Sequence, residues 1–213
     1  MSETVHVATV AGFILAGGES SRMGVDKGLL EIAGVPMIVR AARLVEAVTR
    51  VPGVVVGTPE KYAGLGLRAI ADAWPGCGPL GGIATALRGS GAEWNLIVAC
   101  DLPHLTRDWL EYLLQRARES AEEAVVAMNL TAANKRGAEP LCAMYHQGSE
   151  PAIRRALQRG VRKVTDGLAE LRVEMIEPTK WKAFDSDGLL FKNVNTPADY
   201  AEAKAKFAGR AEK

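Results

Sequence analysis

Apolar, β-rich runs alternate with amphipathic stretches along most of the chain. The run at residues 7–16 is almost continuously apolar, which is typical of a central strand buried on both faces of a parallel sheet. Shorter runs predict further strands at 51–57, 67–71, 94–100, 124–128, 139–145 and 172–176. Because strands alternate with helices, the sequence predicts an α/β fold in three α/β/α layers, with a mostly parallel central sheet.

Helices are predicted between these strands, where apolar residues recur at a spacing of three or four. Pro36 suits a first helical position, so we expect a helix over 37–48. Thr196 is a good N-cap for a last helix that begins at Pro197 and runs to about Phe207. Other helices are expected to begin at Gly81 and to cover 107–118 and 151–159. No repeat or linker-like segment divides the chain, which predicts one domain.

The composition is that of an ordinary soluble globular protein. Of 213 residues, 48% are apolar and 24% are charged. The 26 basic and 25 acidic side chains leave a formal net charge of +1, with no long run of one sign. A general nucleic-acid or membrane-surface binder should carry a basic excess or stripe, so we expect neither partner. Any bound anion must then be held by a local site.

Cysteine usage and the N-terminal residues predict a cytoplasmic protein. Cys77, Cys100 and Cys142 are far apart, without a C-x-x-C pair, which fits neither a disulfide framework nor a zinc site. The first basic residue, Arg22, follows the apolar run, whereas a secretory signal carries its positive charge before that run. The run is also shorter than the roughly 20 residues that a membrane span needs.

Unusual residues follow the ends of several predicted strands. Gly17 and Gly18 come after the first strand, Asp72 after the third and Asp101 after the fourth. In α/β sheets, ligands bind outside the carboxyl ends of the strands. This coincidence is the first indication of where the functional site lies.

The strongest local signal is the segment 15–28, LAGGESSRMGVDKG. Its paired glycines let a phosphate approach backbone N–H donors without a Cβ in the way. Arg22 adds a forked cation and Lys27 a point charge, and Asp26 is read most simply as orienting Lys27. The plain alternative is a surface turn with solvated cations. The chain contains neither a Walker A motif nor a G-x-S-x-G elbow, so those nucleotide and hydrolase classes are excluded.

Segment 15–27 resembles the signature L-A-G-G-x-S-x-R-M-G-x-D-K of the molybdenum cofactor guanylyltransferases, in the nucleotidyltransferase superfamily. Four more segments agree in order, namely 78–82 (GPLGG), 100–103 (CDLP), 139–143 (EPLCA) and 193–197 (NVNTP). Sugar-phosphate relatives carry their lysine later, in a Pro-Lys context. The related cytidylyltransferase usually has Ala-Ala-Gly where this chain has Ala-Gly-Gly, and it lacks the Gly-Pro-Leu-x-Gly pattern. These differences favour guanine.

The resemblance implies a nucleotidyltransferase domain over residues 1–213, with the nucleotide bound by about 8–105 and the acceptor by about 106–200. It implies transfer of GMP from GTP to the terminal phosphate of molybdenum-carrying molybdopterin, with release of pyrophosphate. Transient contact with cofactor-handling proteins is a further expectation. Three alternatives stay open: a CTP-dependent relative, a sugar-phosphate nucleotidylyltransferase and a non-catalytic GTP-binding module. The last of these is disfavoured because Lys27 and Asp101 are both present.

The resemblance also implies roles for single residues. Lys27, Arg22 and Asp101 form the catalytic group, with Asp101 as the ligand of a Mg²⁺ cofactor, since magnesium takes one or two carboxylates plus phosphate oxygens. The nucleotide-binding residues would be Leu15, Ala16, Gly17, Gly18, Lys27, Asp72, Pro79, Leu80, Gly81 and Asp101. Asn193 and Asn195 are candidates for the acceptor site.

Simpler interpretations stand beside several of these roles. Asp101 and Asp72 could each be only the cap of a turn after a strand. Asn193 and Asn195 could be turn and cap residues. Relatives often have an Asn after the second strand, where this chain has Gly57-Thr58, so that nucleotide contact either is lost or moves to the threonine or the backbone.

Overall fold

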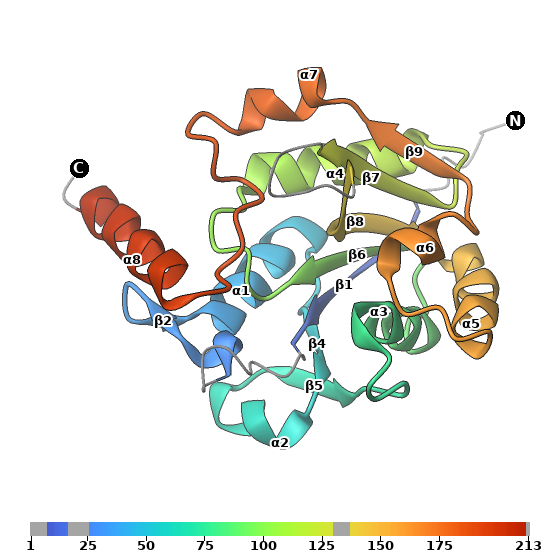
Figure 1. The fold of residues 1–213 in the computed structure, drawn as a ribbon, viewed down its shortest axis with the longest axis horizontal. Helices are drawn as coiled ribbons and strands as arrows, with labels where there is room; N and C mark the ends of the chain where they lie inside the picture. Colours follow the sequence, from blue (N-terminus) through green and yellow to red (C-terminus); the bar gives the residue numbers. More distant parts are fainter. Residues whose placement is uncertain (1–7, 17–25, 130–136, 212–213) are drawn as a thin grey trace, which may run out of the picture.

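The structure is a computed structural model that describes residues 8–16, 26–129 and 137–211. Within these ranges, seven strands form one sheet in the order β5-β4-β1-β6-β8-β7-β9 (Figure 1). Their bounds are β1 Val10–Leu15, β4 Val54–Gly57, β5 Arg68–Ala71, β6 Trp94–Ala99, β7 Ala124–Asn129, β8 Gly137–His146 and β9 Val173–Ile176. Strand β8 is antiparallel to both neighbours, and the other pairings are parallel. The predicted α/β class and mostly parallel sheet are confirmed.

Helices cover both faces of this sheet, α1 and α4 on one side and α3, α5 and α6 on the other (Figure 1). The helices are α1 Met37–Thr49, α2 Pro59–Tyr62, α3 Gly78–Arg88, α4 Arg107–Glu119, α5 Glu150–Gln158, α6 Val164–Leu168, α7 Pro178–Trp181 and α8 Pro197–Ala211. Short 3₁₀ turns are η1 Lys27–Leu29, η2 Ala63–Leu65, η3 Gln147–Ser149 and η4 Lys182–Phe184, and a hairpin joins β2 Glu31–Ile32 to β3 Val35–Pro36.

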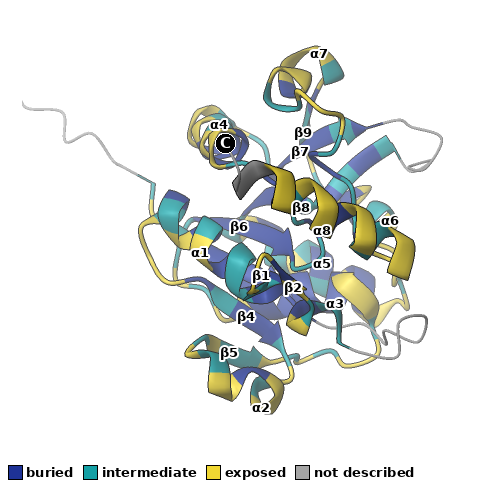
Figure 2. Ribbon diagram, turned by 90° about the vertical axis from the view of Figure 1, so that its left-hand side faces the viewer, coloured by how far each residue is buried: buried dark blue, intermediate teal, exposed yellow. Residues whose placement is uncertain are grey.

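The position of β6 in the centre of the sheet explains why its sequence is apolar at nearly every position. All six of its residues are buried (Figure 2). Leu96 and Val98 pack into the cluster under α1 and α4, whereas Ile97 packs into the cluster under α3 and α5. Full burial of such a side chain contributes about 1.5–3 kcal/mol. A strand with helices on both sides therefore has no polar face to alternate with.

Three predicted boundaries are corrected by the structure. Pro36 is not the first helical residue, because it pairs with Glu31 in the β2–β3 hairpin and α1 begins one step later at Met37. The second strand begins at Val54, because α1 ends at Thr49, Arg50 follows in a left-handed conformation (φ 63°), and the chain turns before it pairs. Helix α3 begins at Gly78, where Pro79 in the first turn supplies a favourable start.

The last helix begins where the sequence predicts. The Asp199 N–H donates to Thr196 Oγ1 at 3.1 Å, and the Asp199 carboxylate accepts from the Thr196 N–H at 2.8 Å. This reciprocal pair satisfies backbone donors that the helix itself leaves open. Helix α8 continues past Phe207 to Ala211. In the part of the chain that the structure describes, no helix is long and apolar enough to cross a bilayer.

Candidate active site

The ends of four parallel strands meet at one edge of the sheet. Leu15 at the end of β1 lies beside Val56 of β4 and Ala99 of β6. Backbone hydrogen bonds continue beyond the strands, from Cys100 N–H to Leu15 O at 3.2 Å and from Asp72 N–H to Gly57 O at 3.2 Å. The residues that follow the strands, Asp72 and Asp101 among them, therefore lie along the edge where the sequence places a ligand.

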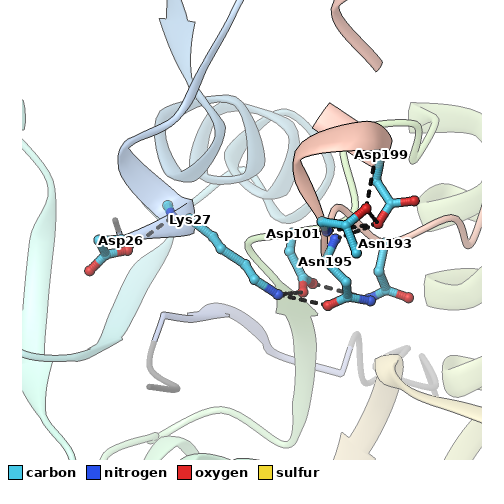
Figure 3. Close-up of polar contacts among 8 residues, drawn as sticks. Asp26, Lys27, Asp101, Asn193, Asn195 and Asp199 are labelled. Atoms are coloured by element: carbon cyan, nitrogen blue, oxygen red, sulfur yellow. Dashed lines mark hydrogen bonds and ion pairs between the residues drawn. The ribbon is translucent and has the colours of Figure 1, made fainter. Parts of the chain in front are cut away.

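Lys27 and Asp101 approach each other at this edge. Lys27 Nζ lies 3.7 Å from Asp101 Oδ2, and the two side chains are only 21% and 19% exposed. Lys27 also donates to Asn195 Oδ1 at 2.7 Å (Figure 3). The lysine stands on the short turn η1, and the aspartate follows β6. Two residues that the sequence assigns to catalysis are thus brought together from separate elements.

A C-terminal segment, residues 193–195, lies against Asp101 and is called the asparagine strap below. Asn193 Nδ2 donates to Asp101 Oδ1 at 3.1 Å (Figure 3). The Val194 N–H donates to the Asp101 carbonyl at 2.9 Å. Asn195 completes the strap by accepting from Lys27. Each asparagine predicted at the acceptor site therefore contacts one of the three residues predicted to be catalytic, Asn193 contacting Asp101 and Asn195 contacting Lys27.

The surroundings of Asp101 favour a cation beside it. Burial raises the pKa of Asp101 because the charged form loses its water, while the Asn193 hydrogen bond and the Lys27 charge act in the opposite direction. A half-buried carboxylate gains strongly from an opposite charge in contact with it. Its Oδ1 is engaged by Asn193, and its Oδ2 faces Lys27 across a distance too long for a hydrogen bond. The group is suited to bind a hard cation through oxygen.

Asp72 is held differently. Its Oδ1 accepts from the Trp74 N–H at 2.9 Å and from Thr85 Oγ1 at 2.8 Å, and Thr85 Oγ1 in turn accepts from the Ala73 N–H at 3.0 Å. One carboxylate oxygen therefore closes the turn between β5 and α3. The role of a turn cap therefore accounts for Asp72 Oδ1. A contact between the Asp72 carboxylate and the nucleotide stays a prediction.

The start of α3 packs tightly against the end of β1. Leu80 is 1% exposed, backbone included, so neither its side chain nor its backbone is open to a nucleotide here, and its predicted nucleotide contact stays a prediction. A Cβ on Gly81 would lie 2.8 Å from the Trp74 carbonyl, and one on Gly82 would lie 3.2 Å from the Leu15 side chain. Pro79 is exposed. The glycines thus allow the helix to approach the loop and the strand that border the predicted nucleotide pocket.

The chain is similar to known proteins over most of its length. Residues 12–173 match the MobA-like NTP transferase domain. The chain is 35% identical over 91% of its length to a Pelotomaculum thermopropionicum protein named "Probable molybdenum cofactor guanylyltransferase", of which 91% is covered. It is 32% identical over 94% of its length to the molybdenum cofactor guanylyltransferase of Desulfosudis oleivorans, of which 98% is covered.

Among solved structures, molybdopterin-guanine dinucleotide biosynthesis protein A from Archaeoglobus fulgidus superposes with a TM-score of 0.78 at 26% identity, with 93% of this chain and 99% of that chain covered. The chain belongs to the MobA-like NTP transferase family. It is accordingly a nucleotidyltransferase, and relatives similar to it over most of its length are named molybdenum cofactor guanylyltransferases.

Part of the MobA-like signature falls outside the described residues. Gly17, Gly18 and Arg22 lie there, so their predicted phosphate contacts stay predictions. Ala16, just before them, is buried, and its N–H donates to Val56 O at 2.9 Å. Where the signature resumes, Asp26 Oδ1 accepts from the Gly28 N–H at 3.0 Å and caps η1, which supports its expected role beside Lys27.

The departure from the MobA-like pattern after the second strand has a structural reason. A Cβ on Gly57 would lie 2.0 Å from the Ala16 carbonyl, so no side chain fits at that position while β4 keeps this distance from β1. Thr58, the next residue, is exposed at the same edge. A nucleotide contact from this loop would therefore come from Thr58 or from the backbone.

Sequence reasoning missed one polar residue of the site. Tyr62, the last residue of α2, donates from its hydroxyl to Asp26 Oδ2 at 3.1 Å. The signal in the sequence is slight, because a tyrosine in a four-residue helix has no periodic pattern around it. The one available signal is that the Asp26 carboxylate, next to Lys27, needs hydrogen-bond donors.

Proposed function

We propose that this MobA-like nucleotidyltransferase transfers GMP from GTP to the terminal phosphate of molybdenum-carrying molybdopterin, forming the guanine dinucleotide and pyrophosphate. The observation that carries the proposal is the meeting of Lys27, Asp101 and the asparagine strap beyond the carboxyl end of β6. The names of two similar relatives support the choice of nucleotide and acceptor.

In this reaction a phosphate oxygen of the acceptor attacks the α-phosphorus of GTP. A new P–O bond forms to that phosphorus, and the bond to the bridging oxygen breaks as pyrophosphate leaves. Negative phosphate groups must approach one another, so catalysis consists mainly of positioning and charge stabilisation. Lys27 is placed to bind the triphosphate, because its ammonium is only partly exposed and is oriented by Asn195 and Asp101.

The residues present fit a magnesium ion. Mg²⁺ binds one or two carboxylates together with substrate phosphate oxygens, and Asp101 offers a half-buried carboxylate with Asn193 fixing one of its oxygens. When bound, the ion would neutralise charge that develops on the phosphates. Asp101 would hold it, Asn193 would keep the carboxylate oriented, and Lys27 would bind the remaining phosphate oxygens.

Asp72 is suited to a different task at the nucleoside end. Its Oδ1 is fixed by Trp74 and Thr85, so the carboxylate is held in one orientation without rearrangement. A preorganised carboxylate accepts hydrogen bonds from N–H or O–H donors, which guanosine carries on its base and its ribose. We therefore keep Asp72, together with the exposed Pro79, on the nucleoside side of the site.

Pyrophosphate release tests the function most directly. With molybdenum-loaded molybdopterin as the acceptor, GTP should be preferred over CTP and ATP by about 10⁴-fold, because a pocket built for one base edge leaves buried polar groups unpaired with another. Comparable turnover with CTP would show that the enzyme is a cytidylyltransferase and not a guanylyltransferase. Turnover with a sugar 1-phosphate in place of molybdopterin would overturn the proposal that molybdopterin is the acceptor.

A further inference from the structure

Tyr62 is almost completely enclosed. Its side chain is 1% exposed and packs into the apolar cluster on the α1 side of the sheet. Its hydroxyl is directed at the site and donates to Asp26 Oδ2 at 3.1 Å. Burial, and next to it the Asp26 charge, raises the pKa of Tyr62, so the hydroxyl keeps its proton throughout the neutral range.

Asp26 connects this tyrosine to the turn that carries Lys27. One carboxylate oxygen accepts from Tyr62, and the other accepts from the Gly28 N–H at 3.0 Å (Figure 3 shows the second contact). The Leu29 N–H donates to the Asp26 carbonyl at 3.1 Å, which closes the same turn. Lys61 Nζ also reaches Asp26 Oδ2, at 3.4 Å, but its side chain is 55% exposed, and such pairs contribute little.

The turn is also fixed on its inner side. Gly28 is buried, and a Cβ there would lie 3.4 Å from Ile38 Cβ and 3.7 Å from Cys100 Sγ. Cys100 directly precedes Asp101 in the chain. The backbone of η1 therefore rests against α1 and the end of β6 on one side and is held through Asp26 to α2 on the other.

We propose that Tyr62 is a positioning residue, which acts through Asp26 to fix Lys27 in the orientation that binds the triphosphate. The inference rests on the proposed function of Lys27. The tyrosine itself does not touch substrate. Without its hydroxyl, Asp26 loses its buried donor, and the turn gains freedom at the residue whose ammonium must meet the phosphates.

Tyr62→Phe removes only the hydroxyl, and Tyr145→Phe is a matched control. Tyr145 is equally buried, and its hydroxyl donates to the Pro140 carbonyl at 2.9 Å, but it packs into the cluster on the opposite face of the sheet. Tyr62→Phe should lower kcat about 10- to 100-fold, as loss of alignment does when it originates away from the chemistry. Tyr145→Phe should change kcat less than about twofold.

A double-mutant cycle with Lys27→Ala separates positioning from general destabilisation. If Tyr62 acts through Lys27, Tyr62→Phe should change the residual kcat of Lys27→Ala less than about twofold, since residues acting as a unit are not additive. An equal fold-loss in both backgrounds, or full activity of Tyr62→Phe, would overturn the proposal. Should Tyr62→Phe fail to fold, Asp26→Ala replaces it in the same cycle.

GTP affinity, measured by calorimetry on the same proteins, distinguishes this proposal from the function on which it rests. If the wild type releases no pyrophosphate, the proposed function fails, and the cycle is read from the Kd for GTP instead. Tyr62→Phe should then raise this Kd in the wild-type background and leave it unchanged in Lys27→Ala. A Kd raised equally in both backgrounds, or in neither, would reject the positioning role.

Discussion

Asp72 and Asp101 occupy comparable positions, each following a parallel strand at the same edge of the sheet. Asp72 is held by the donors of its own turn, the Trp74 N–H and the Thr85 hydroxyl. Asp101 instead faces a lysine and an asparagine that come from distant parts of the chain. The topology of the sheet brings both carboxylates to the ligand, but their neighbours decide whether each is suited to neutral donors or to a cation.

The largest effect that this contrast predicts is on turnover in Asp101→Asn. Asn keeps the size and one oxygen but loses the charge that would hold Mg²⁺, so the rate of GMP transfer should fall about 10³-fold or more. The melting temperature should not fall, because burial already disfavours the charged carboxylate. Steady-state rates of Asp101→Asn at increasing Mg²⁺ concentration check the metal assignment. If the variant reaches the wild-type rate at low millimolar Mg²⁺, Asp101 is not the metal ligand.

Lys27→Ala should have the next largest effect. It removes one oriented donor from the triphosphate, and turnover should fall at least about 10²-fold while the protein melts normally. The measurement is kcat for pyrophosphate release alongside a thermal melt. Full turnover of Lys27→Ala would show that Lys27 has no role in catalysis, and Asp101 would then lack its expected catalytic partner.

Two variants of Asp72 separate its structural oxygen from any contact with nucleotide. Asp72→Asn keeps an acceptor for Trp74 and Thr85, so stability should change little, whereas KM for GTP should rise about tenfold if the carboxylate accepts from the nucleoside. Asp72→Ala loses both contacts and should lower the free energy of unfolding by about 1–2 kcal/mol. An unchanged KM for GTP in Asp72→Asn would show that Asp72 only caps the turn and does not contact the nucleotide.

The smallest effect concerns the helix that holds the asparagine strap. Asp199 accepts from the Asn195 and Thr196 N–H groups, at 3.0 and 2.8 Å, so Asp199→Ala should lower the free energy of unfolding by about 1 kcal/mol at pH 7. GTP turnover should decline a few-fold as the strap loosens around Asp101, whereas the Asp72 side of the site should not respond. A variant as stable as the wild type would show that α8 does not depend on this cap.

Acid should abolish the difference in the free energy of unfolding between Asp199→Ala and the wild type. Burial acts to raise the pKa of Asp199, but the Thr196 hydroxyl and the two N–H donors outweigh it, so the pKa lies below its ordinary value of about 3.9. The carboxylate therefore stabilises the fold above the unfolded-state pKa, and this contribution is lost as pH falls through the folded-state pKa. Urea unfolding at pH 7 and at a pH below the folded-state pKa measures the change, and a constant difference would contradict it.

Much of this edge of the sheet could be predicted from the sequence. The apolar runs that became β1 and β6 place Asp101 correctly, because a strand buried on both faces has no other pattern. The direction of β8 could not be predicted, since a buried strand reads the same in parallel and antiparallel sheets. The β2–β3 hairpin escaped because its two-residue strands are too short to show periodicity.

The candidate site divides in the same way. The place of Lys27 and Asp101 at one edge of the sheet was predictable, because glycines, cations and strand ends fall together in the sequence. The contact of Asn193 with Asp101 was not predictable from local pattern, since the two are separated by 92 positions. Only the family resemblance singled out the asparagines. The burial of Leu80 was hidden because its neighbours in the sequence suggest a helix start and say nothing of what covers it.

The bonds between the asparagine strap and Asp101 set an order of events during synthesis. Asn193 leaves the ribosome 92 residues after the aspartate it orients. At about 5–20 residues per second, this delay is about 5–20 s, during which β1, β4, β5 and β6 can already pair. A nascent chain can therefore form a parallel sheet in which Asp101 faces Lys27 but still lacks the hydrogen bond from Asn193. Translation that stalls before residue 193 would yield a protein that holds its strands together but leaves its carboxylate unaligned.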